Sequence, residues 1–167
     1  MNNISIIPIN NLPEFEPKYD LADEIVKSFS SNNFVLEDKD VIVITQKIVS
    51  KVEDRLIKND NESIEKLIQQ ESLEILRKRG DTVISRTKHG FICANAGIDK
   101  SNIEKGSVLL LPEDPDKTSR DIRKKIEHVT NKKISIIISD TFGRAWRKGQ
   151  TNVAIGSSGI EPLESYI

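Results

Sequence analysis

The chain has 167 residues, 37% hydrophobic and 31% charged, which indicates a folded domain with its own core and excludes a disordered or fibrous chain. A formal net charge of −1 and 5% aromatic residues predict no nucleic-acid partner, and no apolar run approaches the roughly 20 residues of a membrane span. We expect a cytoplasmic protein, because the single Cys93 excludes an internal disulfide and the N-terminus lacks a basic secretory leader.

The first elements are predicted from the spacing of apolar residues. Residues 4–9 favour a short strand, which ends at a turn-prone Asn-Asn-Leu-Pro sequence. Asp20, with Asp23 three residues later, predicts the start of a helix that ends at Asn32. Its predicted buried face comprises Leu21, Ile25, Val26 and Phe29. Residues 41–44, a Val-Ile-Val-Ile run, predict a buried strand.

The segment after this strand, residues 45–51, contains Lys47 and Lys51 together with Thr45 and Ser50. Two lysines and two hydroxyls directly after a buried strand are suitable contacts for phosphate. An amphipathic segment with exposed lysines explains the same pattern. On these residues alone the second interpretation is preferred.

The middle of the chain predicts a helix followed by a hairpin. Residues 61–79 have apolar residues at helical spacing, with basic residues near the end and Gly80 as the stop. Residues 83–86 and 91–94 predict two strands around a turn that contains His89. Cys93 in the second strand is interpreted as a small buried side chain, and His89 as a polar turn residue.

The string Asn-Ala-Gly-Ile-Asp-Lys-Ser-Asn, residues 95–102, follows this hairpin. Carboxylate and amide oxygens are the ligands that Mg²⁺ and Mn²⁺ prefer, so Asp99 is a candidate metal ligand. An ordinary turn stabilised by the Asp99 side chain is the alternative, and it is preferred when the string is taken alone.

Residues 107–111 predict a strand that Pro112 ends. Thr118 with Asp121 resembles a capping box and predicts the start of a helix. The predicted buried face of that helix comprises Ile122, Ile126 and Val129.

The run of residues 134–156 is the richest in chemistry. An apolar strand leads into Asp140 and Thr141, and then into a loop with Arg144 and Arg147 before a second apolar segment. A carboxylate and a hydroxyl at a strand end, next to arginines, suit metal-bound phosphate. A strand followed by a solvated basic loop is equally compatible. Residues 161–167 predict the first turns of a helix without a stop signal, so we expect a truncated chain.

Taken together, Asp99, Asp140 and Thr141 are oxygen ligands at predicted strand ends, where α/β and α+β active sites are usually found. With Lys47, Lys51, Arg144 and Arg147 as phosphate contacts, they predict a metal-dependent phosphate or nucleotide enzyme. The chain contains neither a GxxxxGK[ST] nor a GxGxxG string, so no P-loop or Rossmann fold is predicted. The expected class is α+β, with mixed sheets and flanking helices.

Four strings, in order along the chain, resemble the coenzyme F-420 gamma-glutamyl ligases: VITQKIVSK, HGFICANAGIDKSN, GSVLLLPEDPD and SDTFGRAWRKGQTNVAIGSSGI. The resemblance implies the gamma-glutamyl ligase fold, with residues 1–167 as a single catalytic domain that forms the N-terminal part of a longer family domain. It also implies a ligase that uses GTP and adds L-glutamate to the coenzyme F-420 precursor through an acyl phosphate. As a fragment, the chain is expected to lack part of the site and activity of its own.

Residue by residue, the resemblance implies that Asp99 and Asp140 are catalytic. Asp99 resembles a ligand of the first metal, Asp140 a ligand of the first metal or one shared by both, and Thr141 a ligand of the second. It implies nucleotide contacts by Asn102, by the loop Leu12, Pro13, Glu14 and Phe15, and by Gln46, Lys47 and Lys51. The chain departs from the family at Asn11, where a glycine is usual. Two divalent cations, Mn²⁺ or Mg²⁺, are implied as cofactors, a monovalent cation is allowed, and a homodimer is expected.

Two other hypotheses remain open from the sequence. One is a metal-dependent phosphatase or phosphotransferase with Asp140 as its nucleophile, which would form an aspartyl-phosphate. The other is a non-catalytic module that binds a nucleotide without turnover.

Overall fold

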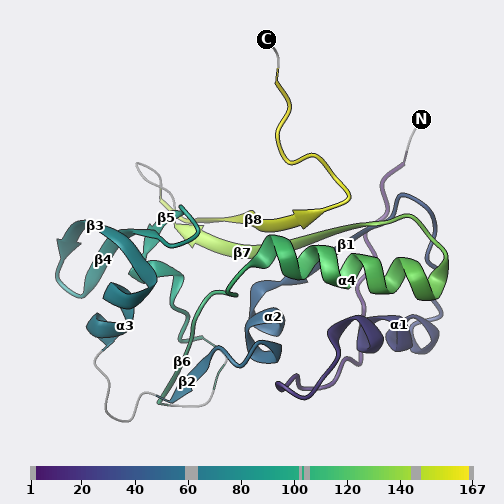
Figure 1. The fold of residues 1–167 in the computed structure, drawn as a ribbon, viewed down its shortest axis with the longest axis horizontal. Helices are drawn as coiled ribbons and strands as arrows, with labels where there is room; N and C mark the ends of the chain where they lie inside the picture. The colour runs from purple at the N-terminus through teal and green to yellow at the C-terminus, as the bar shows by residue number, and fades with distance from the viewer. Residues whose placement is uncertain (1–2, 59–63, 102, 104–105, 144–147, 166–167) are drawn as a thin grey trace.

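The structure is a computed structural model that describes residues 3–58, 64–101, 103, 106–143 and 148–165 (Figure 1). Helices and strands alternate irregularly along the chain. In order they are α1 (Leu21–Ser31), β1 (Val41–Thr45), α2 (Gln46–Val52), β2 (Leu56–Lys58), α3 (Ile64–Glu71), β3 (Ser72–Arg79), β4 (Thr82–Thr87), β5 (Ile92–Ala94), the 3₁₀ turn η1 (Asn95–Gly97), β6 (Ser107–Leu109), α4 (Pro115–Thr130), β7 (Ser135–Gly143) and β8 (Gln150–Ser158).

The main sheet has the strand order β1-β7-β8, with β1 parallel and β8 antiparallel to β7. One face is buried: Ile44, Ile136 and Ile138 lie in the largest hydrophobic core, which α1 and α4 also line. The other face is open, and Val43 in β1 keeps 63% of its surface exposed. The strand predicted at residues 41–44 is confirmed, but its predicted burial is wrong for one face, because β1 is an edge strand that is covered on one side only.

Helix α1 confirms the prediction from Asp20, whose side chain accepts a hydrogen bond from the Asp23 N–H at 3.3 Å. Leu21, Ile25 and Phe29 lie on its buried face, as the apolar spacing predicts. Since a polar side chain satisfies an N–H that the first helical turn leaves free, this cap fixes the point where the helix begins.

Helix α4 begins earlier than predicted. Asp114 is its cap and accepts from the Lys117 N–H at 2.8 Å, and Pro115 occupies the first turn, where its missing N–H costs nothing. The predicted capping box at Thr118 is wrong, because the Thr118 hydroxyl donates instead to Glu53 at 2.6 Å. Val129 is also misassigned, since 62% of its surface is exposed.

A second sheet, β3-β4-β5, forms a lobe with α3 at one end of the main sheet (Figure 1). The hairpin β4–β5 confirms the prediction for residues 83–94. The single helix predicted over residues 61–79 is wrong: α3 ends at Glu71, and β3 then pairs antiparallel with β4. The apolar spacing did not resolve this, because β3 has two bulges, which interrupt the alternation expected of a strand.

The remaining elements link the sheets. Strands β2 and β6 form a short antiparallel pair, and β6 is shorter than the strand predicted over residues 107–111. Residues 4–9 form no strand, and residues 161–165 form no helix, so both terminal predictions are wrong for the described residues. The fold is α+β with mixed sheets and flanking helices, as predicted. None of the helices in the described part of the chain is long and apolar enough to cross a membrane.

Candidate functional site

Three elements bring the predicted charged residues toward one place. Lys47 lies in the first turn of α2, directly after β1, and Asp140 lies on β7, the strand next to β1. Asp99 follows η1 and is fixed by an isolated bridge to Leu109, in which each backbone N–H donates to the other residue's carbonyl at 2.9 Å. The result is two carboxylates and one ammonium that belong to distant parts of the sequence.

Lys47 and Asp99 form an ion pair of 2.8 Å between Nζ and Oδ2. Burial alone would raise the pKa of Asp99, but the hydrogen bonds from Lys47 and from Ser101 hold this pKa below its ordinary value. Asp99 is therefore charged at neutral pH and is already neutralised by a cation of the protein itself. The preference for an ordinary turn at residues 95–102 is confirmed in part, because Asp99 does accept from the Ser101 N–H, at 2.7 Å.

Asp140 lies in a less favourable environment for a charge. Burial raises the pKa of its carboxyl above the ordinary value; the Thr141 N–H opposes this rise, and the nearby charge of Asp99 adds to it. Among the described residues Asp140 forms no salt bridge. Lys47 pairs with Asp99 and its charge also acts on Asp140. Counting only these three described groups, one negative charge is in excess in a partly buried place.

Asp140 is not at the end of its strand. Strand β7 continues through Thr141 to Gly143, so the predicted strand end at Asp140 is wrong. Successive side chains of a strand point to opposite faces. Asp140 lies on the side of buried Ile138 and Phe142, whereas Thr141 is exposed and its hydroxyl donates to Asn152 Oδ1 at 2.7 Å. The structure thus brings Asp140 and Asp99 together but leaves the Thr141 side chain on the other face.

The N-terminal loop lies against α2. Glu14 is exposed and forms an ion pair with Lys51, while Phe15 is buried and packs edge-on against Tyr19 with ring centroids 5.8 Å apart. Leu12 and Pro13 are half-buried. Asn11 has a φ of 61°, the left-handed conformation that favours glycine. The loop therefore keeps the backbone shape that the usual glycine would allow.

Gln46 was predicted to contact the nucleotide, but its side chain is fully buried. Its Oε1 accepts from Ser50 Oγ at 2.9 Å, and its Nε2 has no hydrogen-bond partner among the described residues. In this conformation the side chain is not accessible to a ligand. The segment is an amphipathic helix, as preferred from sequence, but its lysines are not fully exposed: the side chains of Lys47 and Lys51 are 27% and 20% exposed and are both paired with carboxylates. Asn102, Arg144 and Arg147 lie outside the described residues.

Ser101 belongs to this site but was not singled out from the sequence. Ser101 bridges Lys47 and Asp99, and the Asp-x-Ser spacing, which is common in side-chain-stabilised turns, was the available signal. Cys93 lies near Asp140, since burial and the charge of Asp140 together raise the pKa of its thiol to about 11. Its assignment as a small buried strand residue is confirmed.

The donor set fits a divalent cation in part. No group of three or more His, Cys, Asp and Glu that would hold a metal occurs in the part of the chain that the structure describes. Mg²⁺ commonly needs only one or two protein carboxylates, because water and substrate phosphates complete its shell. Asp99 and Asp140 match this requirement, and a cation would satisfy the charge that Lys47 leaves uncompensated.

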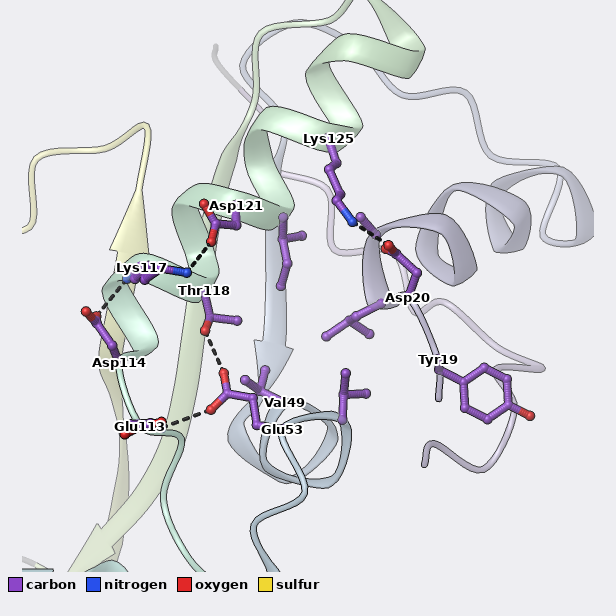
Figure 2. Close-up of a pocket in the computed structure, with 14 residues that line it drawn as sticks. Tyr19, Asp20, Val49, Glu53, Glu113, Asp114, Lys117, Thr118, Asp121 and Lys125 are labelled. Carbon is purple, nitrogen blue, oxygen red and sulfur yellow. Dashed lines mark hydrogen bonds and ion pairs between the residues drawn. The ribbon is translucent and has the colours of Figure 1, made fainter. Parts of the chain in front are cut away.

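A cavity of about 750 Å³ lies elsewhere, between α1, α2 and α4 (Figure 2). Five carboxylates and two lysines line it together with apolar residues, and Lys117 and Lys125 are paired with Asp121 and Asp20. It lies on the side of α2 that carries Val49 and Val52, opposite Lys47 and Lys51 by helical spacing. Because its lining is net negative, we consider it a poor site for a phosphate ligand.

Comparison with known proteins adds a family. Residues 10–167 match the sequence model of the F420-0:Gamma-glutamyl ligase family. The chain is similar to the Coenzyme F420:L-glutamate ligase of Methanococcus maripaludis strain S2, at 44% identity over 77% of the chain and 58% of the relative. The protein of the same name from strain C6 is 42% identical over 86% of the chain and 62% of the relative. The one from Methanothermobacter thermautotrophicus is 36% identical over 96% of the chain and 70% of the relative.

Proposed function

Because this chain belongs to the F420-0:gamma-glutamyl ligase family, we propose that it takes part in joining L-glutamate to the carboxylate of a coenzyme F420 precursor. The observation that carries the proposal is the family match over residues 10–167. The chain spans 58 to 70% of the length of the curated relatives named above. The proposal therefore concerns the function of the protein at the length of those relatives.

In the proposed reaction, which uses GTP, a carboxylate oxygen of the precursor attacks the γ-phosphorus. The bond to the β-phosphate oxygen breaks, which gives an acyl phosphate and GDP. The amino nitrogen of glutamate then attacks the acyl carbon, the carbon–oxygen bond to phosphate breaks, and the amine loses its proton as the amide forms. Much of such a rate comes from positioning and from neutralising the phosphoryl charge.

Asp99 and Asp140 are the residues proposed to hold the first divalent cation, Mn²⁺ or Mg²⁺. Such a cation supplies positive charge to the phosphoryl oxygens when it is bound. A second divalent cation is proposed to use Thr141. The structure limits how it can do so, because the Thr141 hydroxyl lies on the other face of β7 and only its backbone is adjacent to Asp140. A monovalent cation remains compatible with the site.

The proposed nucleotide contacts lie along one face of α2, which carries Lys47 in the first turn and Lys51 in the last turn. Both lysines are held by carboxylates, Asp99 and Glu14, which a polyphosphate would have to replace. The loop Leu12 to Phe15 lies beside Lys51 and offers backbone and apolar contacts. Arg144, Arg147 and Asn102 complete the proposed set, with Gln46 restricted to a supporting role because it is buried. A homodimer in the cytoplasm is part of the same proposal.

The test is a product analysis with the chain extended to the length of its relatives. Mass spectrometry after incubation with GTP, Mn²⁺ or Mg²⁺, L-glutamate and the precursor is expected to show a glutamylated product, with GDP formed only when all substrates are present. Asp140→Asn is expected to abolish both. An aspartyl-phosphate formed without glutamate would favour the phosphotransferase, and GTP binding without turnover would favour the non-catalytic module. Sedimentation of the same sample tests the dimer.

A further inference from the structure

The two carboxylate oxygens of Asp99 have different partners. Oδ1 accepts two hydrogen bonds from Ser101, one from its backbone N–H and one from its hydroxyl, both at 2.7 Å. Oδ2 faces the Lys47 ammonium at 2.8 Å. Oδ1 is therefore committed to the protein by neutral donors, whereas Oδ2 is held by an ion pair alone.

Ser101 also binds the lysine. The Lys47 Nζ donates to the Ser101 hydroxyl at 2.6 Å and lies 3.2 Å from the Ser101 carbonyl oxygen. The same hydroxyl thus donates to Asp99 and accepts from Lys47, so that one side chain sets the relative position of both charges. The backbone of Asp99 is fixed independently by its bridge to Leu109. The carboxylate could still rotate about its side-chain bonds, and the hydrogen bonds from Ser101 restrict that rotation.

We propose that Ser101 is a positioning residue that turns Asp99 so that Oδ2 is presented to a divalent cation, and that the Lys47 ammonium is the internal cation which this ion replaces. The inference rests on the cation site of the proposed function. A carboxylate oxygen that already accepts two hydrogen bonds has little capacity left for a metal, so the cation binds Asp99 through one oxygen. Partners of a ligand's second atom orient it in this way in many metal sites.

If the ion replaces Lys47 at Asp99 Oδ2, then Lys47 should lower the affinity for metal, an effect that the orientation of Asp99 by Ser101 does not predict. In the metal-free protein Lys47 occupies Oδ2, and a divalent ion must displace it in order to bind. Removing the charge of Lys47 is therefore expected to strengthen metal binding. Lys51 lies one helical turn away and is paired with Glu14 instead of Asp99. A lysine at that position does not compete for Oδ2, and it provides a matched control for the loss of one positive charge from the same helix.

The experiment titrates Mn²⁺ into the 167-residue protein without nucleotide and follows free Mn²⁺ by electron paramagnetic resonance. We expect Ser101→Ala to weaken binding about tenfold, Ser101→Thr to bind within about threefold of the wild type because it keeps the hydroxyl, and Lys47→Met to bind roughly tenfold more tightly. Lys51→Met and Ser30→Ala, an exposed serine of α1, are expected to change little. Circular dichroism confirms that each variant is folded.

Wild-type affinity in Ser101→Ala would overturn the positioning role. Equal losses in Ser101→Ala and Ser101→Thr would also overturn it, because the shape of the loop would then set the affinity. Unchanged or weaker binding in Lys47→Met, or an equal gain in Lys51→Met, would overturn the replacement. If the wild type binds no Mn²⁺, or if Asp99→Asn binds like the wild type, the proposed cation site itself fails. Loss of binding in Asp99→Asn with wild-type affinity in Ser101→Ala would reject the inference alone.

Discussion

Asp140 and Thr141 are neighbours in strand β7, yet their side chains lie on opposite faces of the main sheet. The Asp140 carboxyl lies on the side of the core residues Ile138 and Phe142, and the Thr141 hydroxyl is exposed and bonded to Asn152. A cation bound beside Asp140 can reach the backbone of Thr141 but not its hydroxyl. The Asp140 carboxylate and the Thr141 hydroxyl therefore cannot bind the same cation.

This separation predicts different effects of two substitutions on the first cation. Asp140→Asn is expected to weaken Mn²⁺ binding at least about tenfold, because it removes one of the two carboxylates that the described residues offer to the ion. Thr141→Val keeps the β-branched shape and is expected to bind within about twofold of the wild type. Titration of Mn²⁺ measures both. A tenfold loss in Thr141→Val would contradict the assignment of its hydroxyl to the other face.

Helix α4 and strand β8 approach closely at one glycine, which predicts a specific destabilisation. A Cβ on Gly156 would lie 2.5 Å from the Pro115 carbonyl carbon and oxygen, so the start of α4 would have to move. We expect Gly156→Ala to lower the free energy of unfolding by about 1–3 kcal/mol, as overpacking usually does. Urea unfolding followed by circular dichroism measures it.

The control for this variant is Gly143→Ala in strand β7. No described residue has an atom within 4 Å of the position where its Cβ would be, apart from its chain neighbours, so the same chemical change meets no close contact there. Its expected effect is within about 0.5 kcal/mol. Equal losses in both variants would mean that glycine matters through the backbone of the strands and not through contact with Pro115.

The sequence predicted those elements whose signals are local. The cap at Asp20 defines α1, and the β4–β5 hairpin follows from two apolar runs around a short turn. Local signals failed at residues 72–79, where Ile75 and Leu76 fit a helical stripe and pairing with β4 decided for a strand. They failed again at residues 4–9, since an apolar run becomes a strand only when another strand pairs with it.

The sequence pointed to residues that the structure brings together, but it did not predict which of them contact one another. Asp99 and Asp140 were predicted to be oxygen ligands, and the structure places them close enough for their charges to interact. The ion pair of Lys47 with Asp99 joins segments that are far apart in sequence, and no local pattern encodes it. The burial of Gln46 and the opposite orientation of Thr141 depend likewise on which face of an element is covered, which only the tertiary structure decides.

The cap of α1 predicts a dependence of stability on pH. Asp20 accepts a hydrogen bond from Lys125, and this contact chiefly holds the pKa of Asp20 below its ordinary value of 3.8. The folded pKa lies below the unfolded one, so the stabilisation is present above about pH 3.8 and is lost as pH falls through the folded pKa. We expect Asp20→Ala to cost about 1 kcal/mol at pH 7, because the cap is lost.

Asp20→Asn separates the cap from the charge, because asparagine caps helices as well as aspartate does. Its cost at pH 7 is expected to stay below about 1 kcal/mol, which is the range of exposed ion pairs. The advantage of the wild type over Asp20→Asn should shrink in urea unfolding as the pH falls below 3.8. In a Lys125→Met background the difference should depend less on pH; an unchanged dependence there would assign the pKa shift to another group.

The burial of Cys93 predicts that its thiol reacts slowly with disulfide reagents in the folded protein. Its side chain is 4% exposed, and burial together with the charge of Asp140 raises the pKa of the thiol to about 11. At pH 8 only about 0.1% of such a thiol is the reactive thiolate, compared with about a quarter for an ordinary cysteine of pKa about 8.5. With burial included, we expect labelling by a chromogenic disulfide reagent to be at least about 100-fold slower in the native protein than in urea. Cys93→Ser, which has no thiol, gives the background rate. Comparable labelling in the native and unfolded states would show that β5 opens readily. It would contradict the packing of Cys93 in the hydrophobic core that also contains Ile138 and Phe142 of β7.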